Sequence, residues 1–169
     1  MNQLSEAALL TRIRGWTIFF MAGLFASGLS AIPLRPELNF LVQLYAQETP
    51  PTVLGAWLLE VQGAVNDVST RWPFLAIGTD WLAFGHIVIG LGFIGLLRDP
   101  VRNEWLVTWG LIACLLVIPW AWCFGWARGI PWGWRLVDCS FGVGGMVPLI
   151  QIRSYVEELK RRRSMGVSN

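Results

Sequence analysis

The chain has 169 residues, of which 54% are hydrophobic and 14% are charged, and its mean hydropathy is +0.52. About a quarter of the residues of a soluble domain are charged, so this composition argues against an ordinary soluble domain. The formal net charge is +2, and the basic residues cluster in a tail at residues 160–163, a pattern that indicates headgroup contact rather than nucleic-acid binding.

Four stretches without Asp, Glu, Lys or Arg are mostly near the ~20 residues that a helix needs to cross a bilayer. We therefore predict an all-α integral membrane protein, a four-helix bundle that forms a single transmembrane domain over residues 1–169. The predicted transmembrane helices are residues 13–32, 75–97, 105–126 and 131–152.

The first stretch also has features of a signal peptide. Arg12 and Arg14 precede its apolar core, and the small residues 26–28 follow within it. The apolar run is long for a signal core, which favours a retained transmembrane helix.

The loop of residues 33–74 is long and apolar enough to form helices of its own. Pro36 followed by Glu37 is typical of a helix start, and the Pro50-Pro51 pair is typical of its end. A second amphipathic helix is predicted from Thr52 to about residue 66. We expect both helices to lie on the outer membrane surface or to cap the bundle.

The distribution of Lys and Arg predicts the orientation. Nine of the 13 would lie on the side that holds both termini and the loop 98–104, which makes this side cytoplasmic. Residues 153–169 then form a basic cytoplasmic tail, and residues 33–74 form an extracytoplasmic cap.

Small residues recur every fourth position on two of the predicted helices, and this spacing favours close helix packing in lipid. The same stripes could serve a homo-oligomer or a membrane protein partner. Cys123 and Cys139 both fall in the outward half and could pair. The stripes are Ala22, Ala26 and Ser30 in the first helix, and Ser140, Gly144 and Pro148 in the fourth.

Ionisable residues inside predicted spans are the strongest functional signal, because burying a charge in hydrocarbon costs at least ~2.5 kcal/mol. At ~1.5 Å per residue, Asp80, Arg135 and Asp138 lie at comparable depths in the outer half of the membrane. We predict that they meet in a polar ligand-binding pocket. The candidate ligand-binding residues are Asp80, Trp81, His86, Arg128, Trp134, Arg135 and Asp138.

Other interpretations of these residues remain open. Arg135 and Asp138 are three apart and could form an ion pair within one helix. His86, the only histidine, could be a core residue, a proton relay, or a haem ligand with Met21 or Met146 as the second axial ligand. No metal site is predicted, because His86 has no partner at ligand spacing.

Two resemblances follow from longer segments. The residues from Phe84-Gly85-His86 through the loop 98–103 to the segment 134–142 resemble an uncharacterised family of short four-helix bacterial membrane proteins. The topology, the acidic-aromatic loop segment 36–48, the buried carboxylates and the basic tail also resemble the EXPERA group of sterol isomerases and sterol-binding receptors. These resemblances imply a bacterial inner-membrane location and a cavity for an apolar ligand, and no catalytic residue is transferred from either.

The function predicted from the sequence is binding of a lipid-like or isoprenoid ligand in the outer half of the bilayer, and proton-transfer chemistry is left open. One alternative is a non-catalytic accessory or assembly subunit of a larger membrane complex. Another is a haem- or pigment-binding subunit. The expected partners are membrane lipids, with no nucleic acid, and no cofactor is specified.

Overall fold

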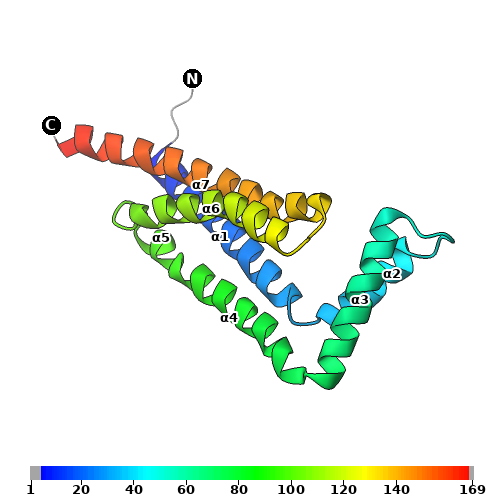
Figure 1. Ribbon diagram of the computed structural model, residues 1–169. Helices are drawn as coiled ribbons and strands as arrows, with labels where there is room; N and C mark the ends of the chain where they lie inside the picture. Colours follow the sequence, from blue (N-terminus) through cyan, green and yellow to red (C-terminus); the bar gives the residue numbers. More distant parts are fainter. Residues whose placement is uncertain (1–4, 168–169) are drawn as a thin grey trace. The chain divides into compact units, whose positions relative to one another are not determined.

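The computed structural model describes residues 5–167, and this range contains helices and no strand. The all-α prediction is therefore confirmed. The elements, labelled in Figure 1, are α1 (Glu6–Ser30), α2 (Leu34–Tyr45), α3 (Val53–Arg71), a 3₁₀ turn η1 (Pro73–Ala76), α4 (Ile77–Gly92), α5 (Ile94–Arg98), α6 (Glu104–Ala127) and α7 (Trp132–Val167).

The prediction of four helices is wrong in number. Within residues 5–167 there are six helical segments when η1, α4 and α5 are counted as one, since only Phe93 separates α4 from α5. Two of the additional helices, α2 and α3, are the amphipathic helices expected in the loop 33–74. Their bounds extend beyond the prediction by a few residues, to Leu34 at one end and Arg71 at the other.

Three of the described helices are long and apolar enough to cross a membrane: Glu6–Ser30, Pro73–Arg98 and Glu104–Ala127. They correspond to the first three predicted spans. The fourth predicted span, 131–152, is the first part of the much longer α7, which is not among the three. Arg135 and Asp138 lower its hydropathy near the start, and from Arg153 onward the helix is rich in charge. Residues 153–167, predicted as a tail after the last helix, continue α7 instead.

The contacts within the chain divide it into two compact units. Unit 1 comprises the chain up to Gly23 and from Gly90 onward, and unit 2 comprises Leu24–Ile89. The first part of α1 therefore belongs to unit 1 together with α5, α6 and α7. Unit 2 contains the end of α1, the helices α2 and α3, and most of α4.

In unit 2, α2 and α3 form an antiparallel hairpin. Leu38 and Leu58 are its buried contacts, and the Gln62 side chain donates a 2.7 Å hydrogen bond to Asn39 Oδ1. The Thr52 hydroxyl caps α3 by accepting from the Gly55 N–H, as predicted for a helix starting there. Most other apolar side chains of the hairpin are exposed.

Phe93 is the centre of the core of unit 1. Its ring is fully buried and packs edge-on against Phe20 of α1, at 4.8 Å between centroids, and more loosely against Trp109 of α6. The other fully buried residues of this unit come from α1, α5, the first half of α6 and the middle of α7. They are Leu9, Ile13, Thr17, Leu96, Val107, Pro148, Leu149, Ile152, Val156 and Leu159.

Helices α6 and α7 lie side by side and antiparallel over the whole length of α6 (Figure 1). Three glycines make this approach possible. A Cβ on Gly142 would lie 2.5 Å from the Cys114 carbonyl oxygen, a Cβ on Gly145 would lie 2.8 Å from Cys114 Sγ, and one on Gly110 would lie 3.0 Å from Leu149. Of the predicted stripe, Pro148 is fully buried, whereas Ser140 and Gly144 are exposed and nothing lies within 4 Å of a Cβ at Gly144.

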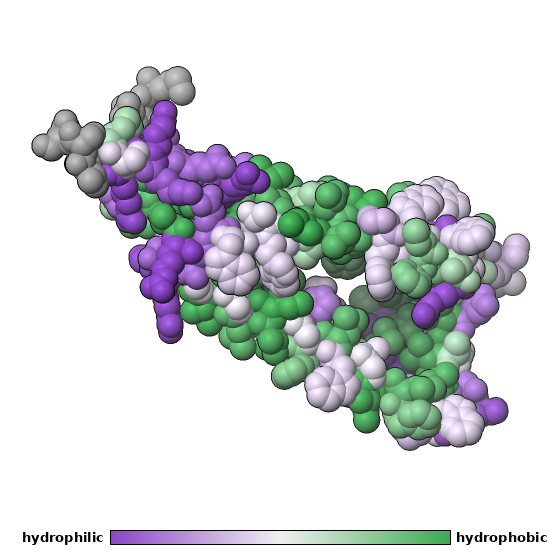
Figure 2. All heavy atoms as spheres, turned by 60° about the vertical axis from the view of Figure 1, so that its left-hand side comes forward, coloured by the Kyte–Doolittle hydropathy of each residue, from purple (hydrophilic) through white to green (hydrophobic). Residues whose placement is uncertain are grey.

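Charged residues gather at the end of unit 1 where α6 begins and α7 ends, seen as hydrophilic atoms around the last turns of α7 in Figure 2. Lys160 binds Glu104 at 2.6 Å, and Arg163 binds Glu6 at 2.7 Å. Arg162 binds Glu158 one turn earlier, which also pairs with Arg161. These ion pairs join the start of α1, the start of α6 and the end of α7, the segments that the Lys and Arg count assigned to one side.

A candidate ligand site between helices α6 and α7

The loop between α6 and α7 is fixed by the way α6 ends. The Ile130 N–H donates to the Gly125 carbonyl at 2.8 Å and the Gly129 N–H donates to that of Trp126 at 3.1 Å. Gly129 has φ of +69°, the left-handed conformation that this helix ending requires and that glycine adopts without strain. Pro131 then starts the next helix, so a four-residue connection reverses the chain.

Arg135 is held against this loop. Its Nε donates a 2.7 Å hydrogen bond to the Ile130 carbonyl, and its guanidinium lies 5.7 Å from the Trp122 ring centroid, within cation–π range. A Cβ on Gly125 would meet the Arg135 Cγ and Cδ at 2.9 Å, so the side chain lies directly on that glycine. Among residues 5–167, Arg135 forms no ion pair, which removes the alternative of a pair with Asp138.

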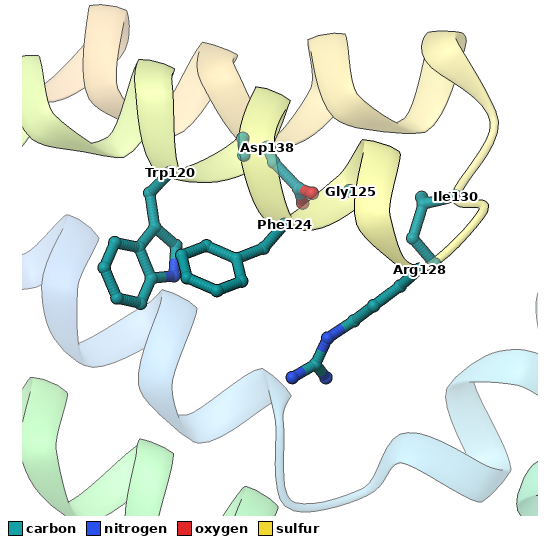
Figure 3. Close-up of a pocket in the computed structure, with 7 residues that line it drawn as sticks. Trp120, Phe124, Gly125, Arg128, Ile130 and Asp138 are labelled. Carbon is teal, nitrogen blue, oxygen red and sulfur yellow. The ribbon is translucent and has the colours of Figure 1, made fainter.

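Beside Arg135 the two helices leave an open hollow of about 300 Å³, drawn in Figure 3. Trp120 and Phe124 of α6 form one wall, with ring centroids 4.3 Å apart. Arg128 and Asp138 line the remainder of the hollow. The full lining is Trp120, Ala121, Phe124, Gly125, Arg128, Ile130 and Asp138.

Neither of the two charged side chains that line the hollow forms an ion pair within residues 5–167. Asp138 is half-buried, and within the described range its carboxylate takes part in no hydrogen bond or ion pair. The Arg128 side chain is exposed and extends away from Asp138 (Figure 3), and the two are not within ion-pair distance. Two opposite, unpaired charges therefore border one cavity. An unpaired charge at a partly desolvated position is costly, which makes the half-buried Asp138 carboxylate receptive to a cationic group, while the exposed Arg128 guanidinium remains accessible to an anionic one.

Unit 2 holds a second, shallower hollow of about 250 Å³ lined by Asp80, Trp81 and Phe84 of α4. The Trp81 and Phe84 rings are in an edge-to-face arrangement with centroids 5.4 Å apart. Both rings are exposed, so a single helix face supplies the entire lining. This hollow is less defined than that of unit 1, where two helices and a loop contribute.

His86 packs where α1 and α4 cross within unit 2. A Cβ on Gly28 would lie 2.7 Å from the His86 Cβ, so glycine at position 28 makes room for the imidazole. His86 Nδ1 lies 2.8 Å from the Leu82 carbonyl oxygen, which can only accept, so Nδ1 carries the hydrogen. His86 forms no hydrogen bond with Asp80, which lies six residues earlier and therefore on a different face of α4.

The structure brings together two of the seven predicted site residues, Arg128 and Asp138, in the hollow of unit 1. Arg135 borders it through Gly125 and Ile130, whereas Trp134 is not part of its lining. Asp80, Trp81 and His86 belong to unit 2, and their meeting with Asp138 and Arg135 stays a prediction.

Sequence reasoning missed the α6 side of the hollow. Trp120, Phe124 and Arg128 recur every fourth residue and therefore share a face of α6. The small residues Ala121 and Gly125 follow them with the same spacing and leave room for the cavity. This pattern is visible in the sequence, but Trp120 and Phe124 were not among the predicted site residues.

Metal and disulfide chemistry find no support in the described part of the chain. No group of three or more His, Cys, Asp or Glu residues there could hold a metal ion. Cys114, Cys123 and Cys139 are all free thiols, so Cys123 and Cys139 are not paired.

Comparison of the chain with protein-family models, with curated proteins and with solved structures finds no match. The two resemblances drawn from the sequence therefore stay predictions, and the functional argument rests on the geometry of the site.

Proposed function

We propose that the protein is an integral membrane protein that binds the polar head of a lipid-like molecule in the hollow between α6 and α7. The observation that carries the proposal is the pair of unpartnered charges, Arg128 and Asp138, beside the aromatic wall of Trp120 and Phe124. Charged groups suit a polar head, and the aromatic wall suits the adjoining apolar chain.

Membrane crossing by α6 implies crossing by the first part of α7. Contacts between the two helices extend from Gly125 and Arg135 at one end to Glu104 and Lys160 at the other. At 1.5 Å per residue, α6 is about 36 Å long, enough to cross a hydrocarbon core of about 30 Å. A membrane around α6 would therefore also surround the adjacent part of α7, even though α7 alone is less apolar.

The depth of the hollow favours a lipid headgroup. It lies at the last two turns of α6, which would reach the boundary between hydrocarbon and headgroups. Trp126 and Trp132 are 76% and 69% exposed at this end, and Trp105 is 61% exposed at the other. Tryptophans at both ends of a span are typical of the membrane interfaces. Arg128 and Asp138 would then meet headgroups of the leaflet opposite the charged end.

Filling the hollow tests the proposal. Ala121 lines it, so Ala121→Phe should occupy the space and prevent retention of a lipid. Ala113→Phe, at an exposed position on the same helix outside the hollow, is the matched control. Native mass spectrometry of each protein released from its membrane counts the retained lipids. Equal retention by wild type and a folded Ala121→Phe variant would contradict the proposal.

A second candidate function, an accessory subunit of a larger membrane complex, is favoured by the exposed apolar side chains of the α2–α3 hairpin. Phe40, Leu44, Tyr45 and Val53 are exposed there. Replacing Phe40 and Leu44 with Ser should release a partner during mild detergent purification if this is their role. Unchanged co-purification would leave membrane contact as the role of this face.

A further inference from the structure

The hollow between α6 and α7 carries information about the class of headgroup it accepts. We propose that it selects a zwitterionic phospholipid with a primary amine, of the phosphatidylethanolamine type, with the phosphate at Arg128 and the ammonium at Asp138. This inference rests on the proposed function and specifies its ligand.

The charge balance of the hollow is the first argument. Its lining contains one cation and one anion, and within residues 5–167 neither forms an ion pair with a protein group. The nearby cation Arg135 is already engaged by the Ile130 carbonyl and the Trp122 ring. A ligand that pairs both charges of the lining must therefore carry both signs.

An anionic headgroup without an amine fits this lining poorly. Its phosphate could bind Arg128, but Asp138 would then face a second negative charge in a partly desolvated setting, where like charges repel strongly. A headgroup that carries both a phosphate and an ammonium offers each charge of the lining an opposite partner, the phosphate for Arg128 and the ammonium for Asp138.

The form of the cation separates two zwitterionic headgroups. A carboxylate accepts hydrogen bonds, and a primary ammonium offers three N–H donors, whereas a quaternary ammonium offers none. A quaternary ammonium is best bound by several aromatic faces around it. Here the aromatic residues in the lining are Trp120 and Phe124 on one wall, so Asp138 favours the primary amine.

The aromatic surface beside the hollow favours a ligand with acyl chains over a free headgroup. Trp120 is 67% exposed and continues the hollow along α6 toward the middle of that helix. A chain attached to the phosphate could follow this aromatic surface into the hydrocarbon. A free headgroup such as glycerophosphoethanolamine has the same charges and would lack this contact.

The test is a lipid competition with the full-length protein in detergent micelles, read by native mass spectrometry. Phosphatidylethanolamine is offered against equal amounts of phosphatidylglycerol or phosphatidylcholine. We expect wild type to retain phosphatidylethanolamine at least tenfold over each competitor. Equal retention of phosphatidylglycerol would overturn the zwitterion inference but leave headgroup binding intact, and equal retention of phosphatidylcholine would overturn the primary-amine requirement.

Two substitutions assign the roles separately. Asp138→Asn should abolish the preference over phosphatidylglycerol, whereas Arg128→Gln should weaken retention of both lipids, because both carry a phosphate. Glu157→Gln makes the same change in net charge as Asp138→Asn at an exposed position of α7 outside the lining, and it should keep the preference. An unchanged preference in Asp138→Asn would overturn the inference.

A final arm distinguishes the lipid from its free headgroup. Glycerophosphoethanolamine at the same concentration should not displace the retained lipid, and displacement at that concentration would overturn the assignment to a membrane lipid. If neither wild type nor Ala121→Phe retains any lipid, the proposed function itself fails, which is a different result from a loss of selectivity.

Discussion

The two ends of the α6–α7 pair contain charged residues in opposite situations. Where α6 begins, Glu104 is paired with Lys160, and neighbouring charges of α1 and α7 are paired as well. Where α6 ends, Arg128 and Asp138 border a cavity without forming an ion pair. Charges that pair with one another connect the helices at the first end, whereas the charges at the second end border a cavity. A structural role fits the first end, and the binding role that we propose belongs to the second.

The largest expected difference between the ends is their side of the membrane. In a variant without native cysteines, Trp132→Cys and Ser164→Cys place a thiol near each end of α7 at exposed positions. A membrane-impermeant maleimide should label Trp132→Cys in intact cells and Ser164→Cys only after permeabilisation. Labelling of both from one side would contradict the crossing of α7.

The next largest effect concerns the packing that connects the two ends. Gly142→Leu would force a side chain into the Cys114 backbone and should lower the free energy of unfolding by about 3 kcal/mol or more. Gly144 lies two residues along the same helix and faces open space, so Gly144→Leu should change the free energy of unfolding little. Thermal unfolding in detergent measures both, and equal stabilities would show that α6 and α7 do not approach this closely.

These glycines show what the sequence could and could not predict. Apolar length predicted α6 and Pro73–Arg98 with bounds close to those found, because hydrocarbon thickness constrains them directly. It also predicted α1, but this helix begins at Glu6, seven residues before the predicted start, because polar residues at its beginning are helical too. The face on which two helices meet depends on how each helix is rotated about its axis. Several stripes of small residues on one helix would allow close packing, each at a different rotation. The stripe with four-residue spacing was therefore chosen over Gly142 and Gly145.

The candidate site was predictable to a similar degree. Asp138 was identified because charge inside an apolar stretch is conspicuous, and Arg128 because it lies in the short loop next to that stretch; the structure puts both in one lining. The contributions of Ala121 and Gly125 were missed because a cavity forms where small residues leave space between two helices, and that depends on how the helices pack. The ion-pair alternative for Arg135 failed since the loop places the Ile130 carbonyl within its reach.

A smaller effect compares the paired and unpaired charges directly. In a double-mutant cycle, Glu104→Gln and Lys160→Gln should show a coupling of about 0.5 kcal/mol, as is usual for a partly exposed pair. Asp138→Asn should leave the free energy of unfolding unchanged or raise it, because no ion pair is lost. A clear destabilisation by Asp138→Asn would mean that the carboxylate has a structural partner.

The smallest expected effect is a pH dependence at the paired end. Hydrogen bonds from Arg162 and Arg161 lower the pKa of Glu158 below its ordinary value of 4.5. The folded-state pKa is thus below the unfolded one, so the stabilisation is complete above pH 4.5 and is lost as the pH falls through the folded value. Thermal unfolding from pH 6 downward should show a loss that Glu158→Gln reduces. An identical pH profile in Glu158→Gln would contradict a contribution of Glu158 to the pH dependence of stability.

The unbroken course of α7 has a mechanical consequence. At 1.5 Å per residue its 36 residues extend about 54 Å, far more than a bilayer's hydrocarbon requires. A small change in the tilt of α7 near Asp138 would therefore produce a larger displacement at the C-terminal end of the helix. The helix would bend most easily at Pro148, which has no N–H to donate to the Gly144 carbonyl.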